Sequence, residues 1–314
     1  MANFGYIQVT RECNQHCRFC SNPPTGMELT LEAAKEMIAG FAANPEYSGV
    51  LLSGGEPTVS EMLPALIEHC AAAGLHCTVI TNGQKLANMS YLKSLRDAGL
   101  KQIVLSLYSV NPEVQNFLTS NPDSHANIMN ALSNLGELGD IRVDTGSVIC
   151  KQNANHLSQN VAFIVSRFQF INHFIWNGLD PVMNRAAENP DTIPRLNDFQ
   201  LQLALAVEKL TGLRKTFRIS RVPLCYLAGF EYASTETRKI VKGEERTIYF
   251  LDSKGETRQR DFRYGKSEKC AVCALDDICA GLYSMDENYF SEELYPVFLS
   301  EAEKQTIIQT IRNG

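Results

Sequence analysis

Short apolar runs alternate with amphipathic stretches over the first 180 residues of the chain. Six runs rich in apolar and β-branched residues predict strands, at positions 4–10, 50–52, 76–81, 102–108, 141–149 and 170–176. Apolar residues spaced by three and four positions predict helices between them, at 30–41, 61–70, 90–98, 111–118, 125–137 and 155–168. Alternating strands and helices are typical of a parallel sheet with helices packed against it.

The pattern changes after about residue 180. Polar, proline-containing residues 186–196 predict a linker, and a last helix is introduced by a capping box of Ser300 and Glu303. Between them we expect a helix, a strand and a β-hairpin, near 196–211, 216–222 and 247–262. The sequence therefore predicts an α/β fold: a partial (β/α)6 TIM-like barrel at residues 1–190, followed by a small α+β domain at residues 191–314.

Composition and charge exclude several classes of function. Apolar residues make up 44% of the 314 residues and charged residues 20%, which is typical of a globular protein with a full core. The net charge of −6 argues against nucleic acid and against an anionic membrane surface as partners. The N-terminus lacks the features of a signal peptide, and no apolar run is long enough to span a membrane. We therefore expect a cytoplasmic protein.

The ten cysteines are unevenly distributed. Three lie near the start, three lie near the end and four stand alone: Cys13, Cys17, Cys20; Cys270, Cys273, Cys279; Cys70, Cys77, Cys150, Cys225. A reducing cytoplasm disfavours structural disulfides, so clustering at short spacings indicates metal ligands instead.

The first group has the spacing Cys13-x3-Cys17-x2-Cys20 in a loop directly after the first predicted strand. Three thiolates with short spacers can each hold one corner of a four-iron cluster, which leaves the fourth iron without a protein ligand. A zinc site would need a fourth ligand nearby, and His16, lying between two of the cysteines, is poorly placed to supply it.

The segment from Cys13 to Cys20, with the aromatic Phe19 before the third cysteine, resembles the signature of radical S-adenosylmethionine (radical SAM) enzymes. The resemblance implies that Cys13, Cys17 and Cys20 ligate a [4Fe-4S] cluster and that the backbone beside Phe19 lies near the adenine of S-adenosylmethionine. It further implies reductive cleavage of that cofactor to a 5′-deoxyadenosyl radical, which abstracts hydrogen from the substrate. A one-electron donor such as a flavodoxin or ferredoxin is then required.

Two other segments at predicted strand ends fit the same resemblance. Gly54-Gly55-Glu56 resembles the family's site for the cofactor's amino group, because glycines expose backbone carbonyls and Glu56 offers an anionic acceptor. Ser106 falls where members of the family contact the ribose or carboxylate of the cofactor. A serine satisfied by neighbouring backbone groups is the alternative interpretation of Ser106.

The C-terminal group, Cys270-x2-Cys273-x5-Cys279, resembles part of the auxiliary-cluster motif of the SPASM and Twitch subfamilies. Tyr283 occupies the position of a further cysteine in the full SPASM pattern. The simplest interpretation is one auxiliary [4Fe-4S] cluster with Cys225 as the fourth ligand. A structural zinc held by the same four thiolates is the alternative.

Cys150 ends the fifth predicted strand, where a thiol could return a hydrogen atom to a substrate radical. A buried, inert cysteine is the alternative, since free cysteine is among the most buried residue types.

The family resemblance leaves the substrate open. Many SPASM and Twitch relatives modify ribosomally made peptides by cross-linking, thioether formation or epimerisation, and we favour this class. The cysteine loop begins at residue 13, from which we expect no leader-recognition domain before it, and this weakens the peptide interpretation. The alternatives are a small-molecule dehydrogenase or rearrangement enzyme and, more remotely, a non-enzymatic zinc or redox-sensing protein.

Overall fold

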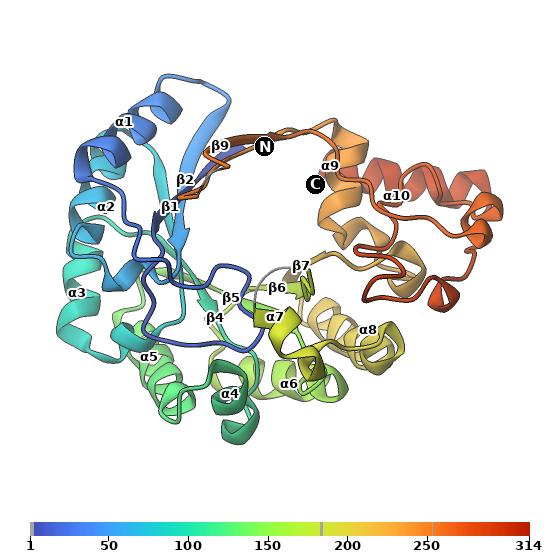
Figure 1. Cartoon of the computed structure of the whole chain (residues 1–314), viewed down its shortest axis with the longest axis horizontal. Helices are drawn as coiled ribbons and strands as arrows, with labels where there is room; N and C mark the ends of the chain where they lie inside the picture. Colours follow the sequence, from blue (N-terminus) through green and yellow to red (C-terminus); the bar gives the residue numbers. More distant parts are fainter. Residues whose placement is uncertain (1–2, 183–184, 253) are drawn as a thin grey trace.

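The strands form one curved sheet of nine, in the order β7-β6-β5-β4-β3-β2-β1-β8-β9 (Figure 1). It is seen in a computed structural model that describes residues 3–182, 185–252 and 254–314. The strands are β1 (Asn3–Thr10), β2 (Tyr47–Gly54), β3 (His76–Thr81), β4 (Gln102–Ser106), β5 (Arg142–Ile149), β6 (His173–Gly178), β7 (Thr216–Ser220), β8 (Arg246–Tyr249) and β9 (Glu256–Gln259). All neighbouring pairs are parallel except the antiparallel hairpin of β8 and β9.

Most helices line the outer side of this sheet, where Figure 1 shows them as an arc around the strands. The helices are α1 (Leu31–Ala42), α2 (Leu63–Ala72), α3 (Met89–Asp97), α4 (Pro112–Thr119), α5 (Ser124–Leu138), α6 (Leu157–Arg167), α7 (Arg185–Glu188), α8 (Leu196–Gly212), α9 (Thr235–Lys242) and α10 (Glu301–Asn313). Buried apolar side chains of the strands and of the inner helix faces form one extensive core. Burial of these amphipathic faces provides most of the stability of such helices.

Helix ends follow local sequence signals. The Thr30 side chain accepts a hydrogen bond from the amide of Ala33 at the start of α1. At the start of α10, the predicted capping box of Ser300 and Glu303 is present in full.

The predicted partial (β/α)6 barrel is confirmed, and the sheet extends beyond it at both edges. β7 adds to β6, and β8 pairs in parallel with β1, with Tyr6 opposite Ile248. The C-terminal part of the chain thus contributes three strands to the barrel's own sheet. Periodicity predicted these strands but not their partners, because β1 and β8 are separated by more than 230 residues.

The loops that carry the candidate chemistry lie together at the carboxyl ends of β1 to β4, as expected for a parallel α/β sheet. Among the residues that the structure describes, no helix has both the length and the apolar character to cross a membrane.

Candidate functional site: a cysteine-lined cavity at the barrel mouth

Two glycines at the end of β2 allow close backbone contact with the cysteine-bearing loop. Gly54 has φ +138°, and a Cβ at this position would lie 2.1 Å from the carbonyl oxygen of Thr10. A Cβ on Gly55 would lie 2.3 Å from the carbonyl oxygen of Glu12. This close approach allows the amides of Gly55 and Glu56 to donate to Thr10 and Glu12, over 2.7 and 2.8 Å. Only glycine fits at positions 54 and 55, so this motif positions the cysteine loop.

Glu56 is almost entirely buried and accepts four hydrogen bonds. Its Oε1 accepts from the amide and hydroxyl of Thr58 and from the hydroxyl of Thr81, and its Oε2 accepts from the amide of Asn82 at 2.6 Å. Burial raises the pKa of the Glu56 carboxyl, and these donors oppose the rise. Since a carboxylate has about four acceptor sites, Glu56 is saturated and links the loops after β2 and β3.

Asn82 connects Glu56 to the cysteine loop. The sequence did not predict this role. Its side-chain amide lies 2.7 Å from Oδ1 of Asn14 and 3.8 Å from Sγ of Cys13. The only local signal is an Asn-Gly pair that ends a predicted strand, which is also typical of ordinary turns.

A cavity of about 250 Å³ lies between these loops. Eight of the residues singled out from the sequence line it: Cys13, Cys17, Phe19, Cys20, Gly54, Gly55, Glu56 and Ser106. Tyr108, Asp180 and Arg221 complete part of its wall. Phe19 and Tyr108 pack edge to face with ring centroids 4.8 Å apart, forming an aromatic surface beside the cysteines.

The three cysteines of this cavity are suited to a cationic centre. Burial raises the pKa of the Cys13 thiol to about 11 and also raises the pKa values of Cys17 and Cys20. For Cys17, repulsion from the other two thiolates adds to the effect of burial. Three half-buried thiolates this close together need a compensating cation, and iron supplies one.

The arrangement differs from a zinc site. His16 is exposed and bonds Arg185 through Nδ1 at 3.2 Å, rather than joining the cysteines. Over residues 3–182, 185–252 and 254–314, no three His, Cys, Asp or Glu side chains surround a single metal-ion position. In a four-iron cluster each thiolate binds a different corner, so the ligands stand farther apart than those of one ion.

Cys150 lies behind this site. Its side chain is fully buried and packs in an apolar group with Phe19, Leu118 and Leu179. It is not among the residues that line the cysteine cavity. A thiol without exposed surface gives a substrate radical no access to its hydrogen, which favours the core interpretation of Cys150.

The four C-terminal candidates lie close together although they come from distant segments. Burial raises the pKa of the Cys225 thiol to about 12, with smaller contributions from the charges of Cys279, Cys270 and Cys273. Cys225 follows β7, whereas the other three belong to the irregular segment before α10.

Hydrogen-bond donors surround these C-terminal thiols. The amide of Val297 donates to Sγ of Cys273, and the amide of Gly281 donates to Sγ of Cys279, each over 3.3 Å. Amide donors to sulfur are among the groups that tune iron–sulfur clusters. The donor set of this second group is therefore suited to an iron–sulfur cluster, whereas within the described residues no three of its thiols surround a single zinc position.

Comparisons with known proteins agree with this geometry. A family model described as the Radical SAM superfamily matches residues 7–164. PqqA peptide cyclase from Bradyrhizobium diazoefficiens is 26% identical over 262 residues, covering 79% of this chain and 64% of that protein. GTP 3′,8-cyclase from Aquifex aeolicus is 33% identical over 154 residues, covering 46% of this chain and 47% of that protein. The chain thus matches less than two thirds of the length of either relative.

Solved structures share the fold. SuiB from Streptococcus suis, bound to S-adenosylmethionine, superposes with a TM-score of 0.64 at 17% identity, covering 89% of this chain and 73% of SuiB. The protein anSMEcpe, with bound AdoMet and a Cp18Cys peptide, gives a TM-score of 0.66 at 16% identity over 99% of both chains. With the family match spanning half of the sequence and including the cysteine loop, the chain belongs to the radical SAM superfamily.

Proposed function

We propose that this protein is a radical SAM enzyme that modifies a peptide. In this proposal Cys13, Cys17 and Cys20 ligate a [4Fe-4S] cluster, and S-adenosylmethionine occupies the rest of the 250 Å³ cavity. The observation that carries the proposal is the convergence of three half-buried thiols, an aromatic wall and a glycine-rich strand end on one cavity inside a radical SAM fold.

The residues of the chain then have distinct tasks. Bound together, the cluster and S-adenosylmethionine supply a 5′-deoxyadenosyl radical that abstracts hydrogen from the substrate. The Phe19 and Tyr108 rings offer an apolar surface to the adenosyl moiety, and Ser106 offers a hydroxyl to its polar groups. Gly54 and Gly55 line the cavity and hold the cysteine loop against the end of β2, while the saturated Glu56 holds the surrounding loops in position.

The C-terminal cysteines have a separate proposed role. We propose that Cys225, Cys270, Cys273 and Cys279 hold one auxiliary [4Fe-4S] cluster. The proximity of the four thiols and the amide donors at Cys273 and Cys279 support this assignment. With all corners ligated by protein, such a cluster would supply electron transfer and would leave no iron open to the substrate. A flavodoxin or ferredoxin would supply the electron that starts the reaction.

Two similar proteins that act on or bind peptides support a peptide as the substrate. They are a PqqA peptide cyclase and SuiB, whose structure bound to the precursor peptide SuiA superposes with a TM-score of 0.65. A small-molecule substrate is the second candidate, because GTP 3′,8-cyclase matches 46% of the chain at 33% identity.

The experiment is anaerobic reconstitution with iron and sulfide, followed by reduction in the presence of S-adenosylmethionine. We expect 5′-deoxyadenosine from the wild-type protein and none from Cys17→Ala. The matched control is Cys70→Ala, a core cysteine on α2 that lies outside the cavity, which should keep the activity. Formation of 5′-deoxyadenosine by Cys17→Ala would refute the ligand assignment. Incubation with peptides encoded beside the gene, followed by mass spectrometry, then separates the two substrate classes.

A further inference from the structure

A second, larger cavity of about 550 Å³ adjoins the cysteine cavity inside the barrel. The two cavities share the side chains of Ile80, Ser106, Tyr108 and Val148 in their walls. A molecule bound in the larger cavity therefore reaches the place where the adenosyl moiety is proposed to bind. This position makes the larger cavity the natural substrate chamber.

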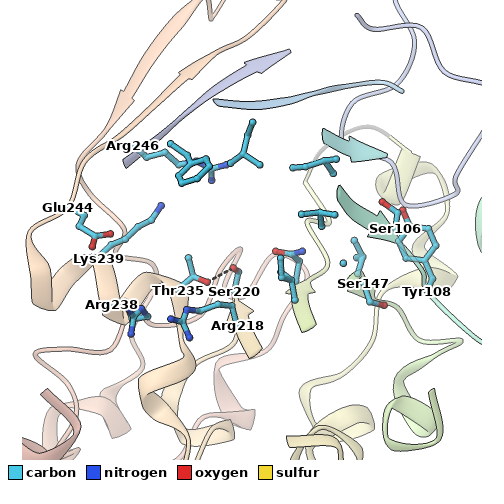
Figure 2. A pocket seen from close by; sticks show the side chains of 18 of the residues that line it. Ser106, Tyr108, Ser147, Arg218, Ser220, Thr235, Arg238, Lys239, Glu244 and Arg246 are labelled. Carbon is cyan, nitrogen blue, oxygen red and sulfur yellow. Dashed lines mark hydrogen bonds between the residues drawn. The ribbon is translucent and has the colours of Figure 1, made fainter. Parts of the chain in front are cut away.

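The far part of this chamber is strongly basic. Four cationic side chains line it: Arg218 from β7, Arg238 and Lys239 from α9, and Arg246 from β8. In Figure 2, Arg246 lies on the wall opposite Arg218 and Arg238, and Lys239 extends into the space between them. Ser106, Tyr108 and Ser147 lie at the other end of the same view, toward the cysteine cavity.

Among the residues that the structure describes, none of these four cations has an anionic partner of its own. Within the part of the chain that the structure describes, no carboxylate lies within 4.0 Å of any of them. Arg218 donates to the carbonyl of Phe217, and the Lys239 and Arg246 groups lie over aromatic rings. Arg238 is buried and the other three cations are half-buried. Charges withdrawn from water are normally paired, so an unpaired group of four indicates that a ligand supplies the counter-charge.

The cations also repel one another. Burial, followed by the charge of Arg238, lowers the pKa of Arg218 to about 10. Burial, followed by the charge of Arg246, lowers the pKa of Lys239 to about 8. Such mutual repulsion destabilises the empty chamber and is relieved when an anion enters.

Two carboxylates in the wall do not neutralise this charge. Glu245 already pairs with Arg260. Glu244 acts on Arg218, Arg238 and Lys239 only at longer range. The chamber therefore keeps an excess of positive charge, although the whole chain carries a net charge of −6.

We propose that this chamber binds the substrate through a carboxylate, held among Arg218, Arg238, Lys239 and Arg246, so that an acidic residue of the peptide anchors it. This inference rests on the proposed function for the peptide class. Guanidinium groups bind carboxylates with paired, charge-assisted hydrogen bonds. Thr235 lies beside them, and its hydroxyl accepts from Ser220 over 2.9 Å, which leaves its own proton for a ligand.

The test measures peptide binding to the reconstituted full chain by ligand-detected NMR at pH 7 and low ionic strength. The probes are capped Gly-Glu-Gly, its neutral Gly-Gln-Gly counterpart and inorganic phosphate. We expect the acidic peptide to bind at least about 10-fold more tightly than the neutral one, because hydrogen bonds between guanidinium groups and a carboxylate are stronger than those to a neutral amide.

The variants Arg218→Gln and Arg246→Gln, on opposite walls, should each weaken acidic-peptide binding about 10-fold or more. The matched control is Arg258→Gln, an exposed arginine of β9 that pairs locally with Glu256, and it should bind like the wild type. Melting temperatures measured beside the binding data show whether each variant is folded.

Equal binding of the acidic and neutral peptides, or no binding of the acidic peptide, would overturn the inference. Tighter binding of phosphate than of the acidic peptide would overturn the carboxylate assignment and favour a phosphorylated small molecule. The proposed function and this inference can be refuted independently. A wild-type protein that forms 5′-deoxyadenosine but does not bind the acidic peptide refutes only this inference. A protein that binds the acidic peptide but cannot cleave S-adenosylmethionine refutes only the proposed function.

Discussion

Replacement of Gly54 by alanine tests whether the end of β2 positions the cysteine loop. An alanine Cβ would lie 2.1 Å from the carbonyl oxygen of Thr10, whereas real Cβ contacts essentially never fall below 3.0 Å. The φ of +138° adds backbone strain for any residue with a side chain. The β1 and β2 ends must therefore separate, which breaks the 2.7 Å hydrogen bond from Gly55 to Thr10.

The energetic cost follows from these two effects. Strain at an unfavourable φ costs about 1–3 kcal/mol, and a lost hydrogen bond costs about 1 kcal/mol. A total of about 2–4 kcal/mol is a large part of the typical free energy of unfolding, and for a chain of 314 residues it corresponds to a melting temperature about 3–6 °C lower. Because the break lies directly before Cys13, iron binding should suffer more than the fold.

The assay combines thermal unfolding by circular dichroism with the iron and sulfide content after anaerobic reconstitution. The matched control is Gly40→Ala in the interior of α1, where a Cβ meets nothing within 4 Å. Alanine in a helix interior should stabilise the protein by about 0.5–1 kcal/mol. A Gly54→Ala protein with wild-type stability and wild-type iron content would refute the reasoning.

Two further predictions concern the C-terminal part of the chain. Cys273→Ser should lower the iron content by about four atoms per chain while S-adenosylmethionine cleavage remains, and iron analysis that finds no loss would remove the auxiliary cluster from the proposal. Affinity for the acidic peptide should fall as the pH rises from 7 to 9, because Lys239, with a pKa lowered to about 8 by burial and by Arg246, loses its charge. Glu236 and Glu244 also face Lys239 and oppose this shift. In Lys239→Arg the fall should disappear, and a persistent fall in NMR titrations would assign the pH dependence to another group.

Short-range patterns made much of the fold and of the first cysteine group predictable. The six barrel strands follow from local apolar runs, and the spacing from Cys13 to Cys20 lies within a single loop. Gly54 and Gly55 were also recognised, but the sequence could not reveal that they contact Thr10 and Glu12. That contact depends on the parallel pairing of β1 with β2, which brings the two strand ends together.

Features assembled from distant segments left no local signal. The donors to Glu56 include Thr81 and Asn82, which belong to the next strand and its loop. The cations of the basic chamber come from β7, α9 and β8. In the sequence, each of these four residues looks like an ordinary charged surface residue. Only the folded chain shows that Arg218 and Arg246 face one space, and that no carboxylate in its described part pairs with either of them.

The central claim is that the cluster held by the N-terminal cysteines keeps one iron open for S-adenosylmethionine. The most direct measurement is the electron paramagnetic resonance spectrum of the reduced, anaerobically reconstituted Cys273→Ser protein, before and after the cofactor is added. This variant leaves the N-terminal cluster as the main source of signal. A changed spectrum on addition of S-adenosylmethionine is predicted, and an identical spectrum would contradict the account.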